Sequence, residues 1–144
     1  MIVGVLKEIK TEENRVCMTP AGVEVMRQNG HTVLVENNAG MGSGFNNRDY
    51  ADAGAEIVDT AEEIFKRSKM VMHVKEPLPP EYKLIRKDQI IFTYLHLAAA
   101  EDLTNVLVKS GSVSIAYETI QKSDGSLPLL TPMSEVAGRM AIQQ

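Results

Sequence analysis

Short apolar runs alternate along this chain with amphipathic stretches of helical length. Five runs have the length and composition of buried strands: IVGVL, HTVLVE, KMVMHV, IIFTY and SVSIA. The segments between them include TPAGVEVMRQNG and EDLTNVLVKSG, which have helical periodicity. Parallel strands need long crossover connections, which are usually helices, so this alternation predicts an α/β domain. We therefore predict a Rossmann-like (flavodoxin-like) parallel sheet flanked by helices.

The helical stretches carry recognisable boundary signals. Thr19 before Pro20 is a typical helix start, and Gly30 is a typical helix stop. Thr60 and Glu63 have the spacing of a capping box in front of a second helix. These signals place two of the predicted crossovers on helices.

The last segment of the chain has a helix start without a helix stop. A helix is expected from Thr131 and Pro132, but no glycine, proline or other cap follows before Gln144. We interpret residues 1–130 as a domain and residues 131–144 as the start of a helix leading into a further domain. The alternative is a terminal helix that frays.

Composition excludes several classes of function. A chain of 144 residues with 44% hydrophobic content can form one domain with a substantial core. Fifteen Lys and Arg residues against nineteen Asp and Glu give a net charge of −4 without long runs of one sign, so nucleic acid is not an expected partner. The apolar runs are far shorter than the roughly 20 residues of a membrane helix. The start of the chain lacks signal-peptide features and Cys17 is the single cysteine, so we expect a cytoplasmic protein.

Arg15 is the first candidate for chemistry. It lies in the polar loop that follows the first predicted strand. Ligands of open α/β sheets bind beyond the carboxyl ends of the strands, and a guanidinium matches a carboxylate in bidentate geometry. The alternative is a solvated charge among neighbouring Lys and Glu residues.

Two further candidates follow other predicted strands. Lys75 ends the run VMHVK before Pro77, where a partly desolvated ammonium can polarise a carbonyl or hold a carboxylate. The alternative is a lysine that reaches solvent and pairs with Glu76. His96 follows IIFTY and precedes three alanines, so it is either an acid/base group beside a ligand or a core residue. We expect Arg15, Lys75 and His96 to face one cleft, because each follows a different strand.

Two other patterns do not predict sites. The stretch AGMGSGF (residues 39–45) has alternating glycines, but Phe45 stands where the dinucleotide fingerprint requires a glycine. We interpret it as a turn-rich loop with positive φ, so a nicotinamide cofactor would need another domain. The remaining histidines, His31 and His73, share no metal-ligand spacing with Cys17, and no metal site is expected.

The stretch GVLKEIKTEENRVCMTPAGVEVMRQNG resembles the N-terminal signature shared by alanine dehydrogenases and the α-subunits of nicotinamide nucleotide transhydrogenases. VMHVKEP, FTYLHLAAA, AYETI and LPLLTPMSEVAGRMA extend the resemblance over essentially the whole chain and are similar to alanine dehydrogenase. A transhydrogenase is not expected to have Lys75 and His96, so these residues favour the dehydrogenase. A segment of a transhydrogenase α-subunit and a free-standing module that binds small carboxylates are the alternatives.

The resemblance implies the N-terminal substrate domain of a two-domain, NAD-dependent L-alanine dehydrogenase, which interconverts L-alanine with pyruvate and ammonia. It implies that Arg15 and Lys75 hold the substrate carboxylate and keto oxygen, that His96 also binds the substrate, and that Lys75 and His96 are catalytic. Ser134 and Met133 are expected near the cofactor. NAD would be bound mainly by a domain absent from this chain, so the chain alone is expected to be inactive. A homo-oligomer, specifically a hexamer, is also implied.

Overall fold

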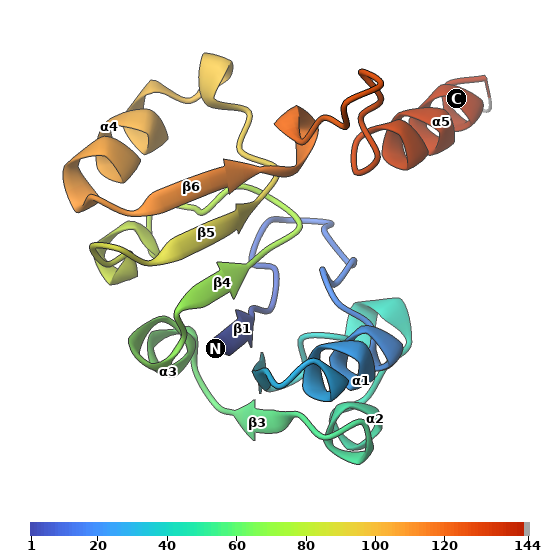
Figure 1. Ribbon diagram of the computed structural model, residues 1–144, viewed down its shortest axis with the longest axis vertical. Helices are drawn as coiled ribbons and strands as arrows, with labels where there is room; N and C mark the ends of the chain where they lie inside the picture. Colours follow the sequence, from blue (N-terminus) through green and yellow to red (C-terminus); the bar gives the residue numbers. More distant parts are fainter. Residues whose placement is uncertain (143–144) are drawn as a thin grey trace.

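A parallel sheet of six strands forms the centre of the computed structural model, which describes residues 1–142 (Figure 1). Each neighbouring pair of strands is parallel, which confirms the predicted fold class. The strands are β1 (Ile2–Val5), β2 (Thr32–Glu36), β3 (Glu56–Val58), β4 (Met70–Met72), β5 (Ile90–Thr93) and β6 (Val113–Ala116).

The strand order is β3-β2-β1-β4-β5-β6. The five predicted strands are all present, and taken alone they follow the 2-1-3-4-5 order of flavodoxin-like sheets. The strand that sequence reasoning missed is β3, which has only three residues and lies at the edge beside β2. With β3 included, the order is that of the Rossmann fold. The chain reverses direction across the sheet between β1 and β4, and that position matters for the site.

Five α-helices and four short 3₁₀ helices connect or follow the strands in the described residues. The α-helices are α1 (Pro20–Gln28), α2 (Asn47–Asp52), α3 (Ala61–Arg67), α4 (Glu101–Ser110) and α5 (Thr131–Met140). The 3₁₀ helices are η1 (Met41–Ser43), η2 (Tyr82–Leu84), η3 (Leu97–Ala99) and η4 (Tyr117–Thr119). No helix among these residues is long and apolar enough to cross a membrane.

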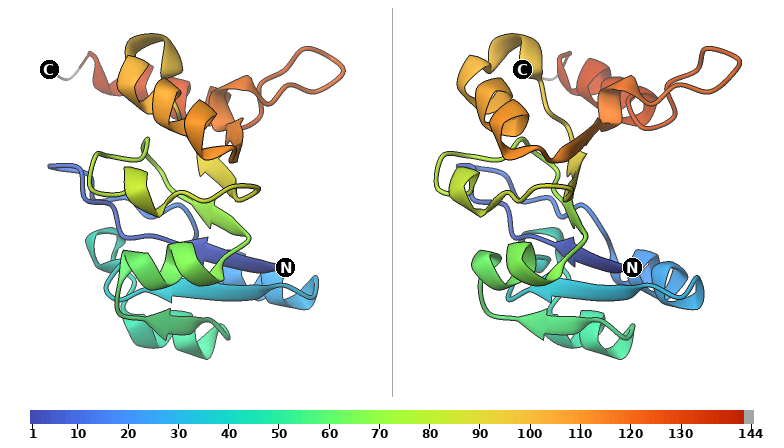
Figure 2. Two further views of the ribbon diagram at one scale, coloured as in Figure 1. Left: turned by 90° about the vertical axis from the view of Figure 1, so that its left-hand side faces the viewer. Right: turned by 60° about the vertical axis from the view of Figure 1, so that its left-hand side comes forward.

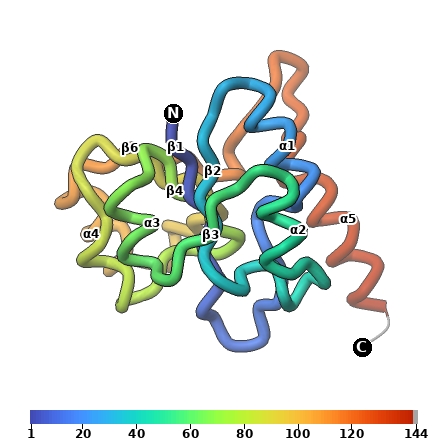
Figure 3. Tube along the Cα trace, turned by 90° about the horizontal axis from the view of Figure 1, so that it is seen from below, coloured from blue at the N-terminus to red at the C-terminus, as the bar shows by residue number. Residues whose placement is uncertain are grey.

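Helices cover both faces of the sheet (Figure 3). α1 and α2 lie on one side of the strands, whereas α3 and α4 lie on the other (Figure 3). Each side has its own apolar cluster, with Val23 and Tyr50 in the first and Phe65 and Leu103 in the second. The strands are apolar on both faces because both faces are packed, as is usual for parallel sheets.

The predicted helix boundaries are largely confirmed. Thr19 caps α1 by accepting a hydrogen bond from the Gly22 N–H, and Gly30 follows the helix with φ of 78°. Thr60 accepts from the Glu63 N–H at 3.3 Å, but no return bond completes the predicted capping box. The Glu63 carboxylate instead binds Arg67 at 2.8 Å, one helical turn later.

The capping box that does form lies in front of α2. The Asn46 side chain accepts from the Asp49 N–H at 3.1 Å, and the Asp49 carboxylate accepts from the Asn46 N–H at 2.7 Å. Asn46 therefore marks the start of α2, a short helix whose single buried residue is Tyr50.

Helix α5 extends beyond the carboxyl ends of β5 and β6 rather than back over the sheet (Figures 1 and 2). It begins at Thr131 as expected and ends at Met140, where the Ala141 N–H bonds to Ala137. The last two residues of the predicted segment 131–144 lie outside the described residues. No residue of α5 is buried, so its apolar side chains contribute little to the two clusters.

Candidate functional site

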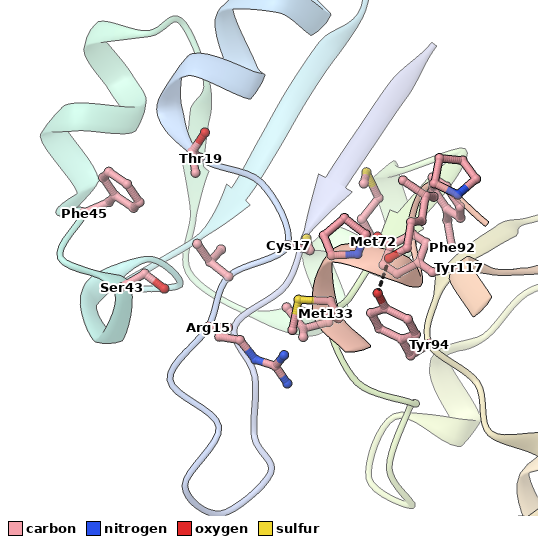
Figure 4. A pocket seen from close by; sticks show the side chains of 15 residues that line it. Arg15, Cys17, Thr19, Ser43, Phe45, Met72, Phe92, Tyr94, Tyr117 and Met133 are labelled. Atoms are coloured by element: carbon pink, nitrogen blue, oxygen red, sulfur yellow. Dashed lines mark hydrogen bonds between the residues drawn. The ribbon is translucent and has the colours of Figure 1, made fainter. Parts of the chain in front are cut away.

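A cavity of about 480 Å³ lies at the carboxyl ends of β4 and β5 (Figure 4). Its walls come from the loop after β1, from the ends of β4 and β5, and from the segment that enters α5. The position is next to the point where the strand order reverses between β1 and β4. Ligands of doubly wound sheets bind at such switch points, so the cavity is the candidate site.

Arg15 lies on the cavity wall, and its guanidinium points toward the side where Tyr94 and Met133 lie (Figure 4). Glu13 holds one edge of the guanidinium: its carboxylate accepts from Nε at 2.8 Å and from Nη2 at 2.6 Å. These hydrogen bonds keep the pKa of Glu13 below its usual value. Arg15 is therefore oriented by an ion pair with a neighbouring glutamate of the same loop, while its side chain is 43% exposed.

Lys75 is half-buried and follows β4. Its neighbour Val74 lines the cavity, whereas Lys75 itself does not. Its carbonyl accepts from the Thr93 hydroxyl at 2.7 Å, which ties the end of β4 to β5. The alternative pairing of Lys75 with Glu76 is wrong, because the Glu76 carboxylate bonds to Lys10 at 2.6 Å. The Lys75 ammonium is thus not committed to the neighbour that sequence reasoning assigned to it.

His96 follows β5 and is exposed, so the alternative of a core histidine is wrong. Its backbone is left-handed, with φ of 49°, a conformation that non-glycine residues adopt mainly where surrounding contacts impose it. The imposing contact is Glu118, whose carboxylate accepts from the His96 N–H at 2.9 Å and from the Leu95 N–H at 3.1 Å. The imidazole stacks on Tyr94, with ring centroids 6.2 Å apart and an angle of 18°. His96 therefore contacts the site through Tyr94, which lines the cavity.

The two residues expected near a cofactor differ in placement. Met133 lines the cavity, whereas Ser134 is exposed in the first turn of α5 and is not on the wall. The structure thus brings Arg15 and Met133 directly to the cavity and places Lys75 and His96 beside it.

Sequence reasoning missed the aromatic wall of the cavity. Phe92 and Tyr117 meet edge to face with centroids 4.4 Å apart, and Tyr94 meets Tyr117 in the same way at 5.1 Å. The Tyr94 hydroxyl donates to the Leu129 carbonyl at 2.5 Å, which joins the end of β5 to the segment before α5. Tyr94 stood inside the quoted run FTYLHLAAA, directly after β5, so position after a strand was an available signal for it.

The cavity wall carries little charge apart from Arg15. Burial raises the pKa of the Cys17 thiol and of the Tyr117 hydroxyl, so both are neutral at physiological pH. The remaining wall is mostly apolar or aromatic, including Val16, Met72 and Phe92. Arg15 is the cation on this wall, and the guanidinium N–H groups that Glu13 leaves open can bind an anion. The arrangement therefore suits a small ligand with one carboxylate.

The glycine-rich loop after β2 supports the site and is packed against the protein itself. Gly44 has φ of 84°, in agreement with the predicted turn. A Cβ on Gly42 would come within 2.7 Å of the Asn14 carbonyl oxygen, and the Ser43 hydroxyl donates to that same oxygen at 2.9 Å. The space beside Gly42 is filled by Asn14, from the loop that carries Arg15. The glycine-rich loop therefore does not fit the phosphates of a dinucleotide.

Among residues 1–142, no three His, Cys, Asp or Glu side chains gather in a way that could hold a metal ion. Near the cavity, the Glu13 carboxylate pairs with Arg15 and the Glu118 carboxylate accepts from backbone N–H groups. The candidate residues from the sequence that lie at or beside the cavity are Arg15, Lys75, His96 and Met133.

Comparison with known proteins places this arrangement in a family. Residues 4–137 match the family model described as "Alanine dehydrogenase/PNT, N-terminal domain". The alanine dehydrogenase of Bacillus subtilis (strain 168) is 57% identical over 143 residues, which is 99% of this chain and 37% of that relative.

Two solved structures show the same fold. One, titled L-alanine dehydrogenase, superposes with a TM-score of 0.94 at 52% identity and covers 99% of this chain and 39% of that one. A transhydrogenase from Sinorhizobium meliloti superposes with a TM-score of 0.77 at 24% identity, over 82% of this chain and 35% of that one, which supports the fold alone. The chain spans less than two fifths of the length of these relatives.

Proposed function

This chain belongs to the family of alanine dehydrogenase and PNT N-terminal domains, and on that premise we propose that it is the substrate-binding part of an NAD-dependent alanine dehydrogenase. The reaction would be the reversible oxidative deamination of L-alanine to pyruvate and ammonia. The observation that carries the proposal is the guanidinium of Arg15, held on one edge by Glu13 and facing an otherwise uncharged cavity at the sheet's switch point.

In the proposed site, Arg15 binds the substrate carboxylate. Glu13 occupies the Nε edge of its guanidinium, so the substrate meets the edge formed by Nη1 and Nη2. Two N–H groups on that edge match two carboxylate oxygens, which fixes the orientation of a molecule as small as pyruvate. Glu13 is then a positioning residue, because it determines which edge of the guanidinium faces the cavity.

Lys75 and His96 would act on the other end of pyruvate. The Lys75 ammonium, brought to the edge of the cavity by the end of β4, polarises the keto oxygen. His96 gives a proton to the substrate in the direction of amination and takes one in the direction of deamination. Its attachment to Glu118 and its stacking on Tyr94 hold the imidazole at the rim.

NAD would supply the hydride acceptor or donor when bound. Met133 on the cavity wall, with Ser134 next to it, fits contact with the nicotinamide end of that cofactor. The glycine-rich loop does not fit its phosphates, since Asn14 already fills the space beside Gly42. We propose that residues 131–144 lead into the domain that binds the rest of NAD, and that residues 1–144 alone are inactive.

The cellular setting follows from the same family membership. We propose a cytoplasmic homo-oligomer, a hexamer, with no nucleic acid or membrane partner. A net charge of −4 without a basic cluster supports the absence of nucleic acid. The two alternatives, a segment of a transhydrogenase α-subunit and a free-standing carboxylate-binding module, differ from the proposal in what the purified protein does.

The test is the activity of the full-length protein that carries this sequence. The proposal predicts NADH oxidation that requires both pyruvate and ammonia, and NAD reduction that requires L-alanine. Hydride transfer between two nicotinamide nucleotides without either substrate would support the transhydrogenase instead. Pyruvate binding by the full-length protein without any turnover would support the binding module.

A further inference from the structure

His73 is a buried titratable residue that the proposed reaction does not use. It directly follows β4 and is 1% exposed. Its Nδ1 lies 3.4 Å from Glu8 Oε1 and its Nε2 lies 3.1 Å from Glu81 Oε1. Neither contact has the geometry of a hydrogen bond, so each ring nitrogen faces one carboxylate at the distance of an ion pair.

The same two carboxylates hold the backbone of the segment that carries Lys75. Glu8 accepts from the Val74 N–H at 2.6 Å and from the Lys75 N–H at 3.4 Å. Glu81 accepts from the Leu78 N–H at 2.8 Å. Glu8, from the loop after β1, thus holds the start of the segment 73–81, and Glu81 holds its end. The His73 ring lies between the two carboxylates.

Burial makes this cluster dependent on a positive charge at its centre. The Glu8 and Glu81 side chains are 4% and 5% exposed, and carboxylates buried to that degree are costly unless a cation pairs with them. Breaking a buried pair by removing one partner leaves the other charge uncompensated. The two carboxylates therefore need the imidazole in its charged form.

Other charged groups surround the cluster without replacing that cation. Glu36 at the end of β2 feels the charge of His73, although burial is what raises the pKa of its carboxyl most, and it accepts from the Lys7 N–H at 2.9 Å. Glu76 is bound to Lys10. Besides His73, Glu8 and Glu81, the charged and titratable groups around the cluster are Cys17, Tyr82, Tyr117, Glu36, Glu76, Lys7, Lys10, Arg15 and Lys75. Of the cations, Lys10 pairs with Glu76 and Arg15 pairs with Glu13, and among the described residues no ion pair joins Lys7 or Lys75 to the Glu8 or Glu81 carboxylate.

We propose that the protonated imidazole of His73 is a clamp that positions Lys75, and that loss of its proton in alkaline solution releases the segment 73–81. The step is a simple deprotonation: the proton leaves to solvent, and two like-charged carboxylates then remain buried at one neutral ring. The two carboxylates then repel each other, and movement of either one toward water weakens its hold on the backbone N–H groups of Val74, Lys75 or Leu78.

The pH range of the clamp follows from the environment of the ring. Burial alone would lower the pKa of His73, but the two carboxylates outweigh it and raise the pKa to about 9. A group whose folded-state pKa is raised contributes stability that is fully present below its unfolded pKa, about 6.5. The contribution is lost as the pH rises from about 6.5 through about 9. Only roughly a tenth of the rings remain charged at pH 10.

The direct test measures amide hydrogen exchange of the segment 73–81 in the full-length protein between pH 7 and pH 10, corrected for intrinsic exchange rates. We expect protection of this segment to fall about tenfold or more in that range. His73→Lys should keep its protection at pH 10, because an ammonium between two carboxylates stays charged there. His73→Gln should lack it already at pH 7. His31→Gln, at an exposed contact with the N-terminus, is the matched control and should behave as wild type.

The link to catalysis rests on the proposed function and has a separate readout. The KM for pyruvate should rise with pH in wild type more steeply than in His73→Lys, since Lys75 is the group released. Constant protection of wild type between pH 7 and pH 10, or the same alkaline loss in His73→Lys, would overturn the clamp. Loss of protection without any difference in KM between wild type and His73→Lys would leave the clamp standing and remove Lys75 from pyruvate binding. The wild-type exchange profile tests the clamp even where a variant fails to fold.

Discussion

Replacing Glu118 should displace the His96 imidazole and so lower kcat, although His96 itself is unchanged. The Glu118 carboxylate accepts from two consecutive backbone N–H groups, those of Leu95 and His96. Glu118→Ala removes both bonds and leaves the His96 backbone in a left-handed conformation with nothing to impose it. We expect the segment to relax and the imidazole to move off Tyr94.

The magnitude follows from the two environments. A hydrogen bond to a charged group contributes about 1.5–3 kcal/mol. Leu95 is 1% exposed, so its N–H loses its partner without access to water, whereas the exposed His96 N–H can bond to solvent instead. We therefore count one bond, about 1.5–3 kcal/mol, and relief of backbone strain offsets part of it. Glu118→Gln keeps a neutral acceptor and should lose about half as much.

The assay compares kcat for alanine formation with the midpoint of chemical unfolding in the full-length protein. Displacement of a catalytic group by about 1 Å can reduce the rate by about 100-fold, so Glu118→Ala should lower kcat by about 10- to 100-fold. Glu24→Ala, which removes an exposed carboxylate on α1, is the control and should leave both quantities unchanged. If Glu118→Ala keeps kcat within about threefold of wild type and its unfolding midpoint, Glu118 does not position His96.

Three further predictions test the packing, the acid/base group and the cavity wall. Gly4→Ala should destabilise the protein by about 1–3 kcal/mol in denaturant titrations, because its Cβ would overlap Ile64 on α3 and Ser68, which caps that helix. Gly138→Ala, where a Cβ meets nothing within 4 Å, should be neutral or stabilising. His96→Ala should lower kcat by about 10²–10⁴-fold while NADH affinity is retained, and a decrease of less than threefold would make His96 a bystander. Cys17, with its raised thiol pKa, should react with iodoacetamide at pH 7 far more slowly than free cysteine, and an equal rate would contradict that raised pKa.

The sheet was predictable because each of its longer strands is an apolar run bounded by residues with a definite backbone role. Thr19, Pro20 and Gly30 mark the ends of α1 in the sequence as they do in the structure. β3 was not predicted because three residues are too few to show the alternation of a strand, and because its pairing with β2 depends on tertiary contact. The capping box predicted at Thr60 also depends on a contact that the spacing does not show. Thr60 accepts from the Glu63 N–H as predicted, but the Glu63 carboxylate binds Arg67 instead of the Thr60 N–H.

The sequence predicted which residues lie near the site, but it did not predict the carboxylates that orient them. Arg15, Lys75 and His96 each follow a strand, and parallel strands bring their carboxyl ends to one edge of the sheet. The carboxylates that orient the Lys75 and His96 segments come from distant parts of the chain: Glu8 is 66 residues from Val74, and Glu118 is 22 residues from His96. A local sequence pattern cannot predict contacts between residues so far apart in the chain. The contacts of His73 with Glu8 were not predicted for the same reason.

Arg15→Lys tests the central claim that Arg15 binds the substrate carboxylate with one edge of its guanidinium while Glu13 holds the other. Lysine keeps the charge but cannot bond to Glu13 and a substrate carboxylate through two parallel pairs of N–H groups. Loss of one charge-assisted hydrogen bond, about 1.5–3 kcal/mol, corresponds to a decrease of about 10- to 150-fold in kcat/KM for pyruvate. The measurement is steady-state kinetics in pyruvate on the full-length protein, with NADH affinity titrated separately by fluorescence. We predict that decrease with unchanged NADH affinity; an unchanged kcat/KM for pyruvate would contradict the account.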